Sequence, residues 1–203
     1  MKPFAVLAVL IFSLAVPSFL AAQSTSSNYT NNHVEIGAFA DYFRLSRTTP
    51  NINFVGVGGR AGFNVHPNIQ LEAEMSYDFE RAFVSPFTNG SGTVTTVRTR
   101  LRPLSALFGP KFQAGSSGPF RAFVTGKVGF VNFTTTNENV PAGFTSSLGA
   151  VTTGNTKVAL YPGGGIEGFW GPFGLRLEAG NEIYFDNGAR NNLKVTFGPV
   201  IRF

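Results

Sequence analysis

The stretch Ile69–Phe79, IQLEAEMSYDF, alternates one apolar residue with one polar residue along its whole length. Successive residues of a β-strand point to opposite faces of the sheet, so this pattern predicts a strand with one apolar face and one polar face. In a soluble sandwich the apolar face would turn inward, whereas in a membrane barrel it would turn to lipid and leave the acids in a polar lumen. The apolar face comprises Ile69, Leu71, Ala73, Met75, Tyr77 and Phe79, and the polar face Gln70, Glu72, Glu74, Ser76 and Asp78.

Seven further segments alternate in the same way, and clusters of Gly, Pro, Asn, Ser and Thr separate them. Alternating segments of about ten residues divided by turns are typical of transmembrane β-strands. We therefore predict an all-β fold over residues 33–203, an eight-stranded antiparallel up-and-down transmembrane β-barrel. The other strands are expected at Val34–Tyr42, Val55–Val65, Thr96–Phe112, Phe120–Phe133, Lys157–Phe169, Leu175–Phe185 and Leu193–Phe203.

The connections between these segments alternate in length. Short turns are expected at His66–Asn68, Gly115–Pro119 and Trp170–Pro172. Bacterial barrels have short periplasmic turns and longer extracellular loops, so this alternation favours an up-and-down topology. The longer connections are expected near residues 46–51, 81–94, 134–156 and 186–191.

The fourth segment has the least regular alternation. Arg98, Arg100 and Arg102 share one parity, whereas Lys111 lies on the other. We predict a bulge or phase slip at Pro103, because proline cannot donate a ladder hydrogen bond and is tolerated at bulges.

The N-terminal residues have the layout of a secretory signal peptide: Lys2, the apolar run Phe4–Val16, and the small pair Ala21 and Ala22. We expect a cleaved signal peptide at residues 1–22 and an N-terminal extension at 23–32; a retained anchoring helix is the alternative. No other apolar run approaches the length of about 18 residues that a transmembrane helix needs. About 180 residues would remain, which corresponds to one domain.

The composition excludes several classes of protein. Cysteine is absent, so disulfides, thiolate metal sites and a cysteine nucleophile are impossible. The net charge of +5 is spread along the strand-like segments instead of forming one basic run, so we expect no nucleic-acid partner. Charged residues make up 13% and hydrophobic residues 43%, which is unusual for a helical enzyme.

Charged residues on the polar parity carry both signs. Eight strands leave a lumen barely wide enough for side chains, so these charges can neutralise one another and fill it. We predict a plug of ion pairs; a narrow porin-like channel for small solutes is the alternative. The predicted lumen network is Glu35, Arg60, Glu72, Glu74, Arg121, Lys127, Glu167, Arg176 and Glu178, and the same inward side is predicted for Asp41, Arg98, Arg100, Glu182, Lys194 and Arg202.

The C-terminal strand places Val195, Phe197, Ile201 and Phe203 on one face, with Pro199 as a departure from the pattern. It resembles the terminal strand that the outer-membrane assembly machinery recognises. Together with LFGPKF at 107–112 and GGGIE at 163–167, it makes the chain similar to the OmpA-like and OmpX-like outer-membrane barrels over about residues 30–203. The resemblance implies a bacterial outer-membrane location, assembly with the barrel assembly machinery and periplasmic chaperones, and a structural or surface-interaction role. We expect a monomer.

The predicted loop end is rich in arginine. Arg44, Arg47, Arg81 and Arg190 are candidate contacts for anionic lipopolysaccharide head groups; ordinary solvated charge is the alternative. Aromatic residues near the strand ends predict girdles at the two membrane interfaces. They are Tyr42, Tyr77, Phe79, Phe130, Trp170, Phe173 and Phe185.

Some barrels of this size modify lipid A with a serine or histidine constellation near the outer leaflet. His33 and His66 fall instead at the predicted periplasmic end, and Ser76 and Ser105 have no histidine partner in this topology. The glycine run 163–165 lacks the Lys-Ser/Thr of a phosphate-binding loop. We therefore expect no catalytic residue, no metal ligand and no cofactor.

Overall fold

The computed structural model describes residues 33–46, 51–88, 92, 94–114, 119–138, 155–186 and 188–203. The predicted signal peptide, the extension at 23–32 and Arg47 lie outside the described residues. No helix of the described part has the length and apolarity needed to cross a membrane. The strands of the described part are β1 (Val34–Leu45), β2 (Ile52–His66), β3 (Ile69–Asp78), β4 (Arg81–Thr88), β5 (Val94–Ala114), β6 (Phe120–Glu138), β7 (Asn155–Trp170), β8 (Phe173–Phe185) and β9 (Ala189–Arg202).

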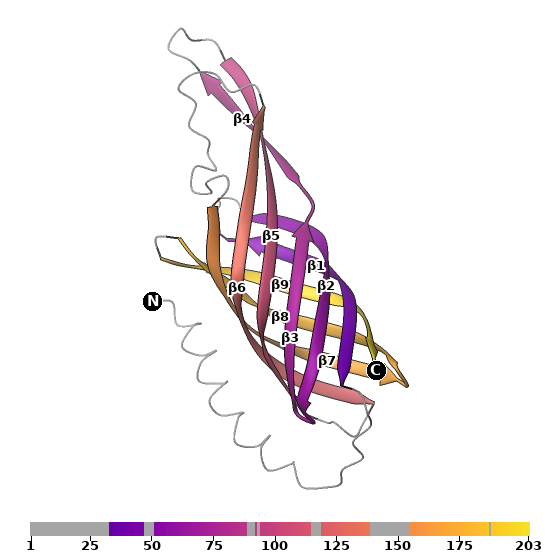
Figure 1. Ribbon diagram of the computed structural model, residues 1–203. Coiled ribbons are helices and arrows are strands. Elements are labelled where there is room, and N and C mark those ends of the chain that lie inside the picture. Colours follow the sequence, from indigo (N-terminus) through magenta and orange to yellow (C-terminus); the bar gives the residue numbers. More distant parts are fainter. Residues whose placement is uncertain are drawn as a thin grey trace. The chain divides into compact units, whose positions relative to one another are not determined.

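The sheet closes into a barrel. Antiparallel pairing joins neighbours in sequence, β3 pairs with β5, and β1 pairs with β9. The final residue seals the ring, because Phe203 N donates to Val34 O at 2.8 Å and Val34 N donates to Phe203 O at 3.3 Å. The closed ring has eight strands, all except β4, which confirms the predicted up-and-down barrel. β4, β5 and β6 extend beyond the other strands at one end (Figure 1).

Three predicted loops are shorter in the structure. β6 extends to Glu138 and β7 begins at Asn155, so both take residues of the predicted loop at 134–156. β4 lies within the predicted 81–94 loop and pairs with β5 from Arg81↔Leu101 to Thr88↔Val94. β9 begins at Ala189, so three residues separate it from β8, in place of the predicted loop at 186–191. In each case strand pairing continues into a segment that was predicted as a loop because of the Asn, Ser, Thr and Gly residues in it.

The predicted phase slip at Pro103 is wrong. Burial alternates without interruption along β5 from Val97 to Gln113. The register instead shifts by one residue on the neighbouring side, between β3, where Tyr77 pairs with Leu104, and β4, where Arg81 pairs with Leu101. Pro103 lies opposite this interruption, and it pairs with Phe133 of β6 on its other side.

Because β5 keeps its phase through Pro103, the predicted side of two arginines is wrong. Arg98 and Arg100, expected in the lumen, lie on the outward parity of β5 and are exposed and half-buried, respectively. The inward parity of β5 belongs to Leu101, Lys111 and Gln113.

The two faces of the barrel wall differ sharply in polarity. Met75 and Phe197 are 58% and 52% exposed, whereas Glu72 and Arg176 are 1% and 2% exposed. A soluble sandwich would show the opposite arrangement, so the sandwich alternative is rejected. The predicted girdle residues lie on the outer surface or are half-buried in it, and Trp170 and Phe173 flank the turn between β7 and β8.

Candidate functional site

The barrel interior is the candidate functional site. Every strand of the ring contributes at least one buried charged side chain, because each has one polar parity that faces the axis. The buried acids are Glu35, Asp41, Glu72, Glu74, Asp78, Glu167, Glu178 and Glu182, and the buried bases are Arg60, Lys111, Arg121, Lys127, Arg176 and Lys194.

Lys127 of β6 lies at the centre of three carboxylates. Its Nζ is 2.6 Å from Glu72 Oε1, 2.5 Å from Glu74 Oε2 and 3.0 Å from Glu178 Oε1. Among the described residues, these three acids form the group whose oxygens lie close enough together to hold a metal ion. The ammonium occupies the position that such an ion would need, so the geometry is that of an internal ion cluster.

Arg176 of β8 connects this centre with the turn end of the lumen. Its guanidinium binds Glu72 through both terminal nitrogens and contacts Glu178 Oε2 at 2.5 Å and Glu167 Oε1 at 3.3 Å. The same group stacks on Phe123, with 4.2 Å between Cζ and the ring centroid. Planar bidentate pairing and ring stacking both require a guanidinium, so lysine is a poor substitute here.

Further charged side chains, from β2, β5 and β6, extend this ion cluster. Arg60 donates to Glu178 at 2.8 Å, and Lys111 Nζ lies 2.6 Å from Glu167 Oε1 and 3.4 Å from Glu35 Oε1. Arg121 lies over the ring of Phe169, 5.1 Å from its centroid. We call the following set the turn-side ion cluster: Glu35, Arg60, Glu72, Glu74, Lys111, Arg121, Lys127, Glu167, Arg176 and Glu178.

A second group lies nearer the loop end. Lys194 Nζ donates to Ser76 Oγ and Ser105 Oγ at 3.0 Å each and to Glu182 Oε2 at 3.1 Å. Tyr161 borders both groups, since its ring centroid is 5.3 Å from Lys127 Nζ and 5.9 Å from Lys194 Nζ. The second group, named here the loop-side ion cluster, comprises Asp41, Asp78, Glu182 and Lys194.

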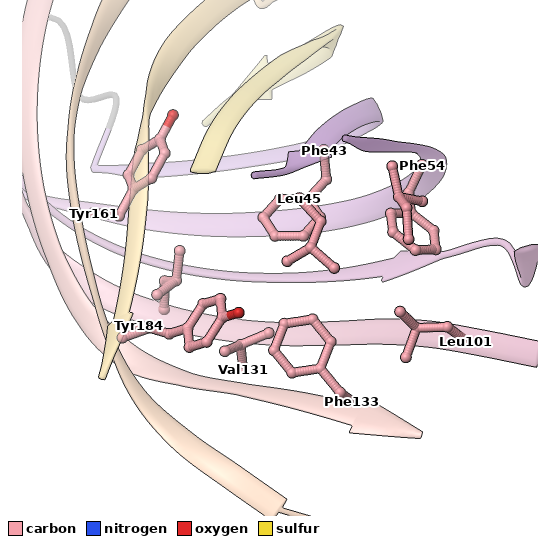
Figure 2. Close-up of a cluster of buried hydrophobic side chains, with 11 residues drawn as sticks. Phe43, Leu45, Phe54, Leu101, Val131, Phe133, Tyr161 and Tyr184 are labelled. Atoms are coloured by element: carbon pink, nitrogen blue, oxygen red, sulfur yellow. The ribbon is translucent and has the colours of Figure 1, made fainter. Parts of the chain in front are cut away.

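Apolar side chains fill the lumen at the loop end. Phe43 and Phe54 lie 6.3 Å apart between ring centroids, and Phe133 meets Tyr184 edge to face at 5.1 Å. Figure 2 shows side chains from several strands meeting there. We call this set the apolar cap: Phe43, Leu45, Ile52, Phe54, Leu101, Val131, Phe133 and Tyr184. Sequence reasoning missed the cap, although the inward parity turns apolar at the loop-end half of these strands.

Most of the residues predicted to face the lumen lie in the barrel interior. All nine side chains of the predicted lumen network are buried in the interior, as are Asp41, Glu182 and Lys194. Lys111 joins them although the network prediction omitted it. Arg202 is half-buried at the turn end, where its Cζ lies 4.3 Å from the Phe169 ring centroid.

The residues predicted at the rim and in the terminal strand lie on the barrel surface or at its ends. Arg44 and Arg81 are exposed at the loop end, and Arg190 is half-buried opposite Tyr184. Phe197, Ile201 and Phe203 are exposed on the outer face, and Val195 is half-buried there.

Both histidines lie at the turn end. His33 stacks on Phe63 with 6.4 Å between ring centroids, and His66 Nδ1 accepts a hydrogen bond from Asn68 N at 3.3 Å.

An eight-stranded closed barrel with an apolar exterior and a charged interior is a transmembrane β-barrel of the outer-membrane type.

No family model and no curated protein sequence matches the chain. Several solved structures share the fold, and two of them are described here. Ail, the attachment invasion locus protein of Yersinia pestis, solved with the heparin analogue sucrose octasulfate, is 13% identical over 85% of this chain and 97% of its own, with a TM-score of 0.50. Neisserial surface protein A (NspA) is 10% identical over 84% and 97%, with a TM-score of 0.54. The chain therefore has the fold of the small OmpA-like and OmpX-like barrels.

Proposed function

We propose that the protein is an integral barrel of the bacterial outer membrane with a structural or surface-interaction role and a closed, non-conducting lumen. One observation carries this proposal: the interior is filled by two ion clusters and the apolar cap, while large apolar side chains cover the exterior. An open pore would need water beside these charges, but their side chains are at most 3% exposed in the ion pairs of the lumen.

Planar-bilayer recording of the purified, refolded protein tests the closed lumen. We expect no discrete conductance steps in concentrated KCl, because the apolar cap and the interlocked ion pairs leave no continuous water path. Regular steps of uniform size would instead support the alternative, a narrow porin-like channel. A general porin recorded in the same membrane serves as the positive control.

The arrangement of the polar groups supports a non-catalytic role. Ser76 and Ser105 share a 2.8 Å hydrogen bond, and Lys194 Nζ donates to both hydroxyls. A serine–lysine pair can act as nucleophile and base only if the amine has a free lone pair. Here the same nitrogen also donates to Glu182, which favours the charged ammonium.

The proposed location requires export and assembly. The predicted signal peptide at 1–22 and the terminal residues Val195, Phe197, Ile201 and Phe203 support secretion, periplasmic chaperone binding and recognition by the barrel assembly machinery. We expect a monomer, since the ring closes within one chain. Fractionation tests the location: the protein should stay in the outer-membrane fraction and change gel mobility on boiling. Release by osmotic shock would contradict it.

Lipid and lipopolysaccharide are the partners that we propose for the outer surface and the loop end. Outside the interior, the described loop-end side chains include seven bases, Arg44, Arg81, Arg98, Arg100, Arg102, Lys157 and Arg190, against the acids Glu80 and Asp186. Guanidinium groups pair well with phosphate. Ail, a structure of the same fold, was solved with a sulfated sugar, another polyanion.

Retention of labelled lipopolysaccharide tests this partner. Replacing Arg44, Arg81 and Arg190 together by glutamine should weaken retention, whereas Arg202→Gln at the turn end should not. Equal retention by all three proteins would show that the loop-end charge is simply solvated.

A further inference from the structure

The outer face of β5 changes from apolar to basic toward the loop end. Nearer the turn end its outward residues are apolar: Leu104, Ala106, Phe108, Pro110 and Phe112. The next three outward residues are arginines, and we call them the arginine strip: Arg98, Arg100 and Arg102. The strip therefore begins where the lipid-facing apolar part of the same strand ends.

β4 and β6 make β5 the central strand of a three-stranded sheet at this level (Figure 1). β3 stops pairing with β5 at Leu104, β4 pairs with it from Leu101 onward, and β6 remains paired as far as Arg98. Backbone pairing on both sides fixes the spacing of alternate residues at about 6.7 Å. The three arginine side chains thus leave the outer surface from one row about 13 Å long.

The described cross-strand neighbours on the same face carry no charge. Arg102 pairs with Thr134 of β6, and Arg100 pairs with Thr136 of β6 and Ala82 of β4. Like charges that are spaced along one face repel each other, and these three neighbours cannot compensate them. An anion placed along the row would relieve this repulsion.

Within the described residues two acids lie near the strip, against its three bases. Arg100 Nε lies 3.5 Å from Glu80 Oε1, and the two side chains are 34% and 43% exposed. An exposed ion pair of this kind contributes little to stability, so another anion can replace the carboxylate. In the strand register Arg98 lies opposite Glu138, the last residue of β6. The strip therefore keeps a net positive charge.

Arg102 fixes the level of the strip relative to the membrane. Its Cζ lies 5.2 Å from the centroid of the Tyr77 ring, and its Nη1 donates to the Tyr77 hydroxyl at 3.2 Å. Tyr77 also meets Phe79 edge to face, with 6.3 Å between the ring centroids. Aromatic girdles lie at the boundary between the acyl chains and the head groups. The arginine strip thus starts at the head-group level and extends outward from it.

We propose that the arginine strip binds the phosphate groups of a phosphorylated lipid in the outer leaflet. This rests on the proposed outer-membrane function and narrows its lipid partner to one site. A guanidinium group pairs with phosphate oxygens through two parallel hydrogen bonds. The apolar outward residues at 104–112 continue the same face, so one molecule can place its acyl chains on them and its phosphates on the arginines. A soluble polyanion would gain nothing from this apolar continuation.

The experiment measures lipid binding to the whole refolded chain by native mass spectrometry in a zwitterionic detergent. The probes are a bis-phosphorylated lipid A and the same lipid after removal of both phosphates. Wild type is compared with the strip variant Arg98→Gln/Arg100→Gln/Arg102→Gln and with the control Arg202→Gln at the turn end. The rim variant is Arg44→Gln/Arg81→Gln/Arg190→Gln, and the change of gel mobility on boiling shows which proteins are folded.

We expect the strip variant to bind the phosphorylated lipid at least about tenfold more weakly than wild type, since each base near a membrane surface adds to the attraction. The rim variant and Arg202→Gln should stay close to wild type with this probe, and the dephosphorylated lipid should bind all four proteins equally weakly. Wild-type affinity in a folded strip variant overturns the proposal. An equal loss for both lipids also overturns it, because phosphate would then not be the group recognised.

A milder variant keeps the test decisive if the strip variant does not fold. Arg98→Gln/Arg100→Gln leaves the contact between Arg102 and Tyr77 intact and should still bind the phosphorylated lipid several-fold more weakly. If the two variants of β5 lose binding to heparin chains but not to the lipid, the ligand is a soluble polyanion and the proposal fails.

The rim variant separates this proposal from the proposed function. If only the rim variant loses lipid, the strip is not the site, but a lipid partner at the loop end stands. If every variant binds both lipids like wild type, the lipid partner fails as well.

Discussion

Replacing Lys127 by methionine removes the ammonium at the centre of the turn-side ion cluster. Glu72, Glu74 and Glu178 each lose a contact of 2.5 to 3.0 Å in a site where every partner is at most 1% exposed. Arg176 still neutralises Glu72 and Glu178, but Glu74 keeps only Lys194 at 3.7 Å. Breaking a buried pair costs about 3 to 5 kcal/mol, because the remaining charge stays desolvated. We expect Lys127→Met to lower the free energy of unfolding by that amount.

A second substitution separates charge imbalance from lost packing. In Lys127→Met/Glu74→Gln the cluster again has equal numbers of acids and bases, four of each. We expect the double variant to recover about 0.5 to 3 kcal/mol of the loss, the range of coupling between contacting residues.

Trp170 provides the signal for this measurement. It is the single tryptophan of the chain and is 62% exposed on the outer surface, so its fluorescence should report the loss of the lipid environment during urea unfolding. Arg98→Met, at an exposed outward position, is the matched control and should leave the free energy of unfolding unchanged. If Lys127→Met unfolds at the wild-type urea concentration, the ion cluster does not stabilise the barrel and the reasoning is refuted.

Two further predictions concern the barrel wall. Gly129→Ala should lower the free energy of unfolding by at least about 2 kcal/mol in the same urea assay, because its Cβ would lie 1.9 Å from Ala106 O. Gly126→Ala is the control and should be neutral, because nothing lies within 4 Å of the added Cβ. Removing Phe203 should reduce the heat-modifiable protein in the outer membrane several-fold, since its backbone pairs with Val34 at the seam and its ring is part of the proposed assembly signal. Wild-type levels after that deletion would contradict the proposed signal.

Sequence alone sufficed for the eight strands of the ring and for most of their faces, but not for β4. Leu71 and Glu72 point to opposite sides because strand periodicity is a local property that needs no knowledge of the partner strand. The same rule places Glu72, Lys127 and Arg176 on the buried face of their strands. It also gives the number of strands in the ring and the short turns between them. Alternation does not show which face of a strand meets lipid. The low content of charged residues and the aromatic residue at the C-terminus supplied that part of the prediction.

Tertiary structure alone decided the pairing of particular residues. The side taken by Arg98 and Arg100 depends on whether β5 keeps its phase through Pro103, and in the structure it does, so both arginines lie on the face opposite to Lys111. Likewise, Lys194 donates to residues of three other strands, and Asp41 and Asp78 flank Gly56 because β1 and β3 pair with β2 in this register. Such contacts join residues that closure brings together from distant parts of the chain, so no local pattern specifies them.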